Sequence, residues 1–192
     1  MKKWIVVLII VIAGFTLMTS YNGLVKAEEE IDSVWANVES SYQRRSDLIP
    51  NLVNTVKGQA NFEQNTLTGV IEARAKASQT KIDPTNLTQE QLEQFQQSQN
   101  QVGSALSRLL VTVEKYPELK AHEGFINLQV QLEGTENRIN VARNKFNDAA
   151  RIYNQKVRQF PTKLAALILG FKEKPYFKSA SGSENAPVVD FN

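Results

Sequence analysis

The feature that most constrains this chain is a long apolar run near its N-terminus, directly after two lysines. Residues 4–18 read WIVVLIIVIAGFTLM, and Thr16 is the only polar member. A helix of about 18 residues would be about 27 Å long here, close to the thickness of the hydrocarbon core of a bilayer. Trp4 and Tyr21 flank the run, where aromatic rings favour the membrane interface. The sequence therefore predicts a transmembrane anchor in residues 1–21.

Two other interpretations of this run stay open. A cleaved signal peptide has the same basic start and apolar stretch, although the residues before Tyr21 match a cleavage site poorly. A buried core helix is the second alternative. If the run is an anchor, flanking charge predicts its orientation, because Lys2 and Lys3 precede it whereas residues 28–32 are mostly acidic. Basic residues favour the cytoplasmic side, so we expect the N-terminus inside and the remaining chain outside.

The rest of the chain has few residues that break helices. Only 9 Gly and 6 Pro occur among 192 residues, and between Leu24 and Tyr116 the only prolines are Pro50 and Pro84. This distribution favours helices over strands joined by many turns. Hydrophobic residues make up 42% of the chain, which is enough to bury a core. We therefore predict an all-α fold.

Composition also disfavours several classes of function. The net charge is only +2 and no basic stretch alternates with aromatic residues, which argues against nucleic-acid binding. The chain contains no cysteine, which removes thiol nucleophiles and cysteine-based zinc sites. His122 is the only histidine, so a di-iron bundle site, a His-Glu-x-x-His zinc site and a serine triad are all excluded. We expect His122 at the start of a helix.

We therefore predict no catalytic, cofactor-binding or metal-binding residues, and no enzymatic activity. The sequence also has no glycine-rich phosphate loop. Counting residues does not exclude paired carboxylates of the glycosidase type, but these would need a cleft.

Four segments have the apolar spacing that is typical of helices. They span residues 22–60, 62–79, 89–116 and 125–153. Segments of this length with short connections favour antiparallel neighbours, so residues 22–160 are predicted to form an up-and-down four-helix bundle.

The ends of these segments carry more specific signals. Ser46 or Asp47 can cap a new helix that has Pro50 in its first turn, so we expect a kink or break near residues 45–47. Residues 82–88 are predicted as a loop, and Thr88 followed by Gln91 resembles a capping box for the third helix.

The last segment has the clearest periodicity. Its apolar positions alternate steps of three and four, which is typical of a coiled-coil-like seam. These positions are Phe125, Leu128, Leu132, Thr135, Ile139, Ala142, Phe146, Ala149 and Tyr153. If the first and last helices are antiparallel neighbours, Glu136 lies near Asp47 and Arg45, and Arg143 lies near Glu39. The same registry returns Phe160 to the membrane.

A polar stripe runs beside this seam and across the first helix. We define it as Glu39, Arg44, Arg45, Asp47, Asn51, Glu136, Asn140, Arg143, Asn147 and Asn154. The members on the last helix are three, four or seven residues apart and so share one face. One interpretation is a surface that binds a partner. The other is a network of salt bridges and amides that fixes helix register.

Residues 161–178 are predicted as a membrane-proximal or capping segment. Within them, residues 164–171 read LAALILGF and are flanked by lysines, a composition that suits the headgroup region. The candidate membrane contacts are Leu164, Leu167, Ile168 and Phe171. The alternative is that this segment folds back and plugs the end of the bundle. Residues 179–192 are predicted to be a flexible tail.

Residues 89–101 are rich in glutamine, which is typical of a solvated helix face. The alternative is a contact surface, or pairing of two copies through Phe95.

Several short motifs occur in order along nearly the whole chain. They are YNGLV at 21–25, RSDLIPNLV at 45–53, YPELKA at 116–121, Leu132 with TENRI at 135–139, Ala142-Arg143, YN at 153–154 and FP at 160–161, with Glu63 and Arg74 between the second and third. In this order they resemble the LemA family. Phe146 is a small departure, because the family often has tyrosine there.

The resemblance implies a bacterial membrane protein with one N-terminal span and a four-helix bundle, and it implies no established molecular activity. Some members of the family are tied to shaping magnetosome membranes, and others lie near genes for a membrane metallopeptidase. One topology described for the family places the N-terminus outside, opposite to the orientation that the charges predict.

The function expected from these features is that of a single-pass, non-enzymatic scaffold in the bacterial cytoplasmic membrane, which organises proteins or the bilayer of the cell envelope. The alternative is an accessory subunit of an envelope protease or transporter complex. The expected partners are the lipid bilayer and other envelope proteins, with a homo-oligomer as a further option and no nucleic acid.

Overall fold

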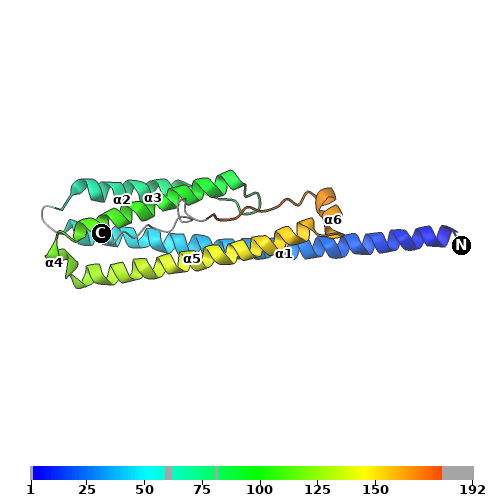
Figure 1. Ribbon diagram of the computed structural model, residues 1–192, viewed down its shortest axis with the longest axis horizontal. Helices are drawn as coiled ribbons and strands as arrows, with labels where there is room; N and C mark the ends of the chain where they lie inside the picture. The colour runs from blue at the N-terminus through cyan, green and yellow to red at the C-terminus, as the bar shows by residue number, and fades with distance from the viewer. Residues whose placement is uncertain (1, 59–61, 81, 179–192) are drawn as a thin grey trace, which may run out of the picture.

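The computed structural model describes residues 2–58, 62–80 and 82–178, and every regular element in these ranges is a helix. The helices are α1 (Lys2–Lys57), α2 (Gln64–Gln79), α3 (Gln89–Val113), α4 (Pro117–Lys120), α5 (Glu123–Arg158) and α6 (Thr162–Leu169). They form an elongated molecule in which the start of α1 projects beyond all other elements (Figure 1). The all-α prediction is confirmed.

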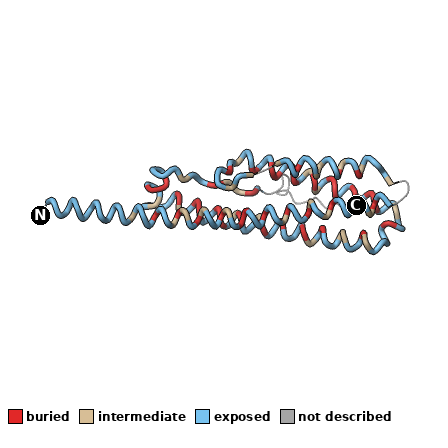
Figure 2. Tube along the Cα trace, turned by 180° about the vertical axis from the view of Figure 1, so that it is seen from behind, coloured by how far each residue is buried: buried red, intermediate tan, exposed pale blue. Residues whose placement is uncertain are grey.

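The apolar run and the first helix of the bundle form one element. α1 contains 56 residues, which corresponds to about 84 Å at the rise of an α-helix. Its first turns are exposed on all sides, and burial begins at Ser20 and Leu24 (Figure 2). This helix contains a stretch near the N-terminus that is long and apolar enough to cross a membrane.

The sequence predicts a kink or a break near residues 45–47, and the break is wrong because α1 continues through Pro50 to Lys57. Proline lacks an N–H, so the carbonyl of Ser46 loses its usual partner one turn ahead. Arg74 of α2 replaces that partner, and its Nε donates to the Ser46 oxygen at 2.9 Å. A side chain from another helix therefore compensates for the proline, which no pattern inside α1 reveals.

α5 packs along α1 in the opposite direction. Lys156 Nζ donates to the carbonyl of Gly23 at 3.2 Å, and Arg45 Nη1 lies 3.2 Å from Glu136 Oε2. Both contacts lie close to the registry expected from the sequence. The predicted seam of α5 is buried, except for the half-buried Leu128. His122 occupies the N-cap position of α5, without a side-chain capping bond.

α2 and α3 form a second antiparallel pair. The predicted capping box is present: Thr88 Oγ1 accepts from the Gln91 N–H at 3.2 Å, and Gln91 Oε1 accepts from the Thr88 N–H at 3.0 Å. α3 ends at Val113, a few residues earlier than expected, because Pro117 begins the separate short helix α4.

The buried side chains form two clusters along the molecule. We name them by their distance from the apolar start of α1. The anchor-distal core, which lies farther from it, combines residues of α1, α2, α3, α4 and α5. The anchor-proximal core combines residues of α1, α3, α5 and α6 with Leu87 and Phe177, and α2 contributes no residue to it in the described ranges. The molecule therefore differs from a uniform four-helix bundle in its anchor-proximal half.

Aromatic rings dominate the anchor-proximal core. The Trp35 ring lies 5.4 Å from the rings of Phe95 and Phe146, and it stacks on Phe177 at 6.1 Å with an interplanar angle of 8°. Pairing of two copies through Phe95 is therefore wrong, because this ring is buried against Trp35 and Tyr42.

Candidate functional site: the polar face of α5 and the C-terminal segment

Residues 171–178, here called the C-terminal segment, follow α6 and run back along the bundle in extended form (Figure 1). Asn147 and Asn154 of the polar stripe bind its backbone. Asn154 Nδ2 donates to the carbonyl of Lys174 at 2.8 Å, and its Oδ1 accepts from the N–H of the same residue at 2.8 Å. Asn147 holds Phe177 in the same way, at 3.0 and 2.8 Å. Each asparagine therefore satisfies both polar groups of one residue.

The spacing of the two asparagines explains why both can bind. They are two helical turns apart on α5, a distance of about 10.5 Å at 1.5 Å per residue. Lys174 and Phe177 are three residues apart in extended chain, which spans about 10 Å. Seven residues of α5 therefore span nearly the same distance as three residues of the segment. The two side-chain amides bind the extended backbone as a neighbouring strand would bind it in a sheet.

The end of the segment is held from two helices. Arg143 Nη2 of α5 and Gln96 Nε2 of α3 both donate to the carbonyl of Lys178, at 2.8 and 2.7 Å. The Lys178 ammonium lies 2.5 Å from Glu93, and the Arg143 guanidinium lies over the ring of Phe177 at 5.0 Å. The segment therefore fills a groove between α3 and α5.

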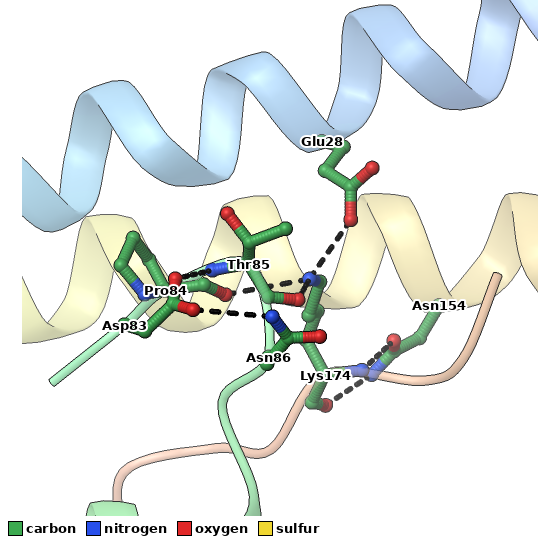
Figure 3. Close-up of polar contacts among 7 residues, drawn as sticks. All are labelled: Glu28, Asp83, Pro84, Thr85, Asn86, Asn154 and Lys174. Atoms are coloured by element: carbon green, nitrogen blue, oxygen red, sulfur yellow. Dashed lines mark hydrogen bonds and ion pairs between the residues drawn. The ribbon is translucent and has the colours of Figure 1, made fainter.

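Lys174 is the most buried charged group of the segment, with 5% of its side chain exposed. Its Nζ lies 2.9 Å from Glu28 Oε1 of α1, 2.5 Å from the carbonyl of Thr85 and 3.3 Å from that of Pro84 (Figure 3). It also lies 5.7 Å from the centre of the Tyr153 ring. One lysine thus joins α1, the loop before α3, and α5.

The described part of the anchor-proximal half also contains buried polar atoms without partners, and two of the residues that carry them, Asp32 and Tyr153, lie near Lys174. Among the described residues, Asp32 Oδ1, the indole nitrogen of Trp35 and the Tyr153 hydroxyl are buried without a hydrogen-bond partner. Burial raises the pKa of Asp32, an effect that Lys174 opposes and Glu28 reinforces. Burial also raises the pKa of Tyr153, with a smaller contribution from Glu28. The Lys174 ammonium therefore lies in an acidic surrounding that is only partly solvated.

Arg45 forms a second buried polar centre, where α1, α3 and α5 meet. Its exposure is 5%, and its Nη2 donates to the carbonyl of Gln99 at 3.1 Å and to Gln99 Oε1 at 2.7 Å. Burial lowers the pKa of Arg45, while the half-exposed Glu136 counteracts this shift. Gln99 and Glu136 already bond the Arg45 guanidinium, so this side chain is better placed to hold the three helices together than to bind a ligand.

The remaining members of the stripe do not join these contacts. Glu39, Arg44, Asn51 and Asn140 are exposed. Asp47 is also exposed and accepts from Gln43 Nε2 one turn away at 2.7 Å. The structure thus divides the stripe into the Arg45–Glu136 contact, the side chains of α5 that hold the C-terminal segment, and a solvated remainder.

Sequence reasoning missed Lys174 and Phe177 as site residues. A signal was present, because the eight residues of the segment read FKEKPYFK and contain three aromatic rings. Such a density of rings is unusual for a stretch that stays in solvent. The predicted tail at residues 179–192 lies outside the described residues.

The predicted membrane contacts of α6 are mostly exposed. Leu164, Leu167 and Ile168 are 52%, 80% and 72% exposed, whereas Ala165 and Ala166 on the opposite face are buried. Gly170 directly follows α6 with a φ of 81°, and this conformation lets the Phe171 N–H donate to the carbonyl of Ala166 at 3.0 Å. This turn directs Phe171 to Tyr21, at 6.1 Å between ring centres.

The described residues contain no group of three or more histidine, cysteine or acidic side chains that could hold a metal ion. The polar atoms of the groove bind the backbone of the chain itself. The arrangement therefore has the geometry to bind an extended peptide backbone.

Comparison with known proteins supplies the family. The profile of the LemA family matches residues 34–191. The chain belongs to the LemA family. The match covers most of the bundle, α6 and the C-terminal segment, and it begins after the apolar run.

Relatives of this LemA-family chain include two magnetosome proteins and one LemA protein. It is 27% identical to "Magnetosome protein MamQ 2" of Paramagnetospirillum magneticum and 28% identical to "Magnetosome protein MamQ" of Magnetospirillum gryphiswaldense, over 91% of this chain and 70% of each relative. It is 24% identical to "Protein LemA" of Metamycoplasma hominis, over 91% of this chain and 76% of that protein. These relatives and the exposed apolar helix are consistent with a membrane-associated protein of uncertain molecular function.

Proposed function

We propose that this LemA-family chain is a non-enzymatic scaffold of the bacterial cytoplasmic membrane, with its N-terminus inside and its bundle outside. It meets the bilayer at two points, the apolar start of α1 and the exposed face of α6. The observation that carries the proposal is the position of α6 beside α1, where the apolar run of α1 ends.

The contact of Tyr21 with Phe171 supports this geometry, because Tyr21 closes the apolar run and Phe171 follows α6 directly. Phe160, just before α6, is 79% exposed, and the apolar side chains on the outer face of α6 are exposed as well. Lys163, in the first turn of α6, and Lys172, just after the helix, are both exposed and can meet headgroups. A short helix with an apolar outer face and flanking lysines is suited to lie in the interface.

Two attachment points would fix the tilt of the bundle relative to the bilayer, which a single helix does not do. Such an orientation suits a protein that organises its surroundings at the membrane. The names of the MamQ relatives associate those proteins with the magnetosome, a second reason to favour a role at a membrane.

A fluorescent label on a single cysteine tests the second contact, since the chain has no cysteine of its own. Leu167→Cys, labelled and reconstituted into vesicles that contain lipid-bound quenchers, should be quenched strongly. Val130→Cys provides the control, because Val130 is also exposed but lies in the anchor-distal part of α5. Equal quenching at both positions would refute the contact of α6 with the bilayer.

A second measurement tests the orientation. Ser33 is exposed on α1 beyond the apolar run, so Ser33→Cys should react in intact cells with a reagent that does not cross the cytoplasmic membrane. Protection in intact cells and reaction after lysis would place the bundle in the cytoplasm instead.

A further inference from the structure

The groove between α3 and α5 recognises the C-terminal segment mainly through its backbone. Asn147, Asn154, Arg143 and Gln96 all bind main-chain groups of the segment. Side-chain amides that pair with an extended backbone impose geometry without demanding a particular sequence. The groove therefore has the chemistry of a site for an extended peptide, which residues 174–178 occupy.

Three side chains of the segment add specificity. Lys174 enters an acidic surrounding that contains Glu28 and Asp32, and Lys178 pairs with Glu93. Phe177 is 6% exposed and lies between the rings of Trp35 and Phe146. A fitting ligand thus carries a lysine, an aromatic residue three positions later and a second lysine directly after it.

The segment is attached to the bundle in a way that permits its exchange. Gly170 lies between α6 and the segment, in a backbone conformation that only glycine adopts easily. An open cavity of about 890 Å³ lies along the segment, between Gly170 and the loop before α3. α1 packs directly on α5, and α2 packs directly on α3, so neither of these helix pairings is made through the segment.

We propose that the groove binds the C-terminal segment of a second copy of this chain, so that neighbouring copies on one membrane are joined by exchanged segments. A second copy presents the matching lysines and phenylalanine by identity, and exchange of an identical element is an economical route to association. The inference rests on the proposed membrane anchoring only in that anchoring confines copies to one surface and raises their effective concentration.

Reach limits how the copies can lie. The four residues from Gly170 to Lys174 span at most about 14 Å when fully extended. Exchange therefore requires two bundles in contact at the end that carries α6. The exposed apolar residues of α6 would then lie close together in the pair.

Cross-linking between two different single-cysteine chains tests the exchange. Glu93 and Lys178 form an exposed ion pair. One full-length chain therefore carries Glu93→Cys and another carries Lys178→Cys, and a cross-link between them reports that the segment of one chain lies in the groove of the other. The two chains are mixed, reconstituted into vesicles and treated with a short bismaleimide. As the control, Glu72→Cys on the exposed face of α2 replaces Glu93→Cys and reports random collision.

We expect several-fold more cross-linked dimer from the Glu93→Cys mixture than from the Glu72→Cys mixture. Adding Phe177→Ala to the Glu93→Cys chain weakens its own segment and frees its groove, so the yield should rise about tenfold, equivalent to about 1.4 kcal/mol. Lys174→Ala serves the same purpose if the phenylalanine variant does not fold. Adding Asn147→Ala to this freed groove should return the yield to the control level, whereas Asn140→Ala should not.

Dimer yields at the control level in all backgrounds, with folded chains, would overturn the exchange. This result is independent of the quenching at Leu167, so the exchange and the second membrane contact can fail separately.

Discussion

The two halves of the bundle are built by different means. The anchor-distal core is largely aliphatic and consists of helix faces, including one face of α2. The anchor-proximal core is aromatic, and there the C-terminal segment takes a place to which α2 does not contribute. The distal half depends on regular apolar spacing, whereas the proximal half depends on one extended segment and the side chains that hold it. The halves should therefore respond differently to substitution.

The largest difference is expected between Trp35→Ala and Leu52→Ala, two fully buried positions on α1. Trp35→Ala should lower the free energy of unfolding by about 3–5 kcal/mol, and Leu52→Ala by about 2–5 kcal/mol. Only Trp35→Ala removes the ring on which Phe177 stacks. Thermal unfolding followed by circular dichroism measures stability, and chymotrypsin cleavage near Phe177 measures release of the segment. Equal cleavage in the two variants would show that the halves are not distinct.

Asn154→Ala should have the next largest effect. It leaves the buried N–H and carbonyl of Lys174 without partners, at a cost of about 2–3 kcal/mol. Asn140→Ala on the same helix is the matched control and should change stability by less than about 0.5 kcal/mol, because Asn140 is exposed. Urea unfolding in detergent compares the two. Similar losses would mean that the asparagines contribute only through helix propensity.

Arg74→Met tests the distal half. It should cost about 1–2 kcal/mol, because the Ser46 carbonyl beside Pro50 loses its donor. In a Pro50→Ala background the new N–H can bond Ser46, so the same substitution should then cost much less. A double-mutant cycle measures this coupling, and purely additive losses would be inconsistent with compensation of the proline by Arg74.

The smallest effect is expected for Asp32→Asn, and it depends on pH. The folded-state pKa of Asp32 is raised, so the folded chain holds this proton more tightly than the unfolded chain. Stability from this group is therefore greatest at low pH and falls as pH rises through the range just above the ordinary pKa of aspartate. Asp32→Asn should raise the melting temperature slightly at pH 7, and the gain should shrink toward pH 4. A gain in melting temperature that grows as the pH falls would contradict a raised pKa of Asp32 in the folded chain.

The register of α5 and the start of α3 were predictable because their determinants are local. The seam of α5 follows from residue spacing, and the capping box of Thr88 follows from residues three apart. The continuity of α1 was not predictable, since Arg74 lies 28 residues from the Ser46 carbonyl that it binds.

The site divides in the same way. The stripe on α5 was visible as a polar face, but its partner was not, because Lys174 lies 20 residues from Asn154 and Phe177 lies 30 residues from Asn147. Periodicity detects which face of a helix is polar. It does not reveal that an extended segment returns to that face, because such a segment has no period of its own.

Hydrogen exchange at two backbone amides tests most directly whether the C-terminal segment completes the proximal half. The N–H groups of Lys174 and Phe177 each donate to an asparagine of α5 at 2.8 Å. Both should exchange slowly in the full chain, and Asn154→Ala and Asn147→Ala should each remove protection at the residue that it holds. If both amides of the unaltered chain exchange at the rate of an unstructured peptide, the two asparagines do not hold the C-terminal segment, and its role in the proximal half is contradicted.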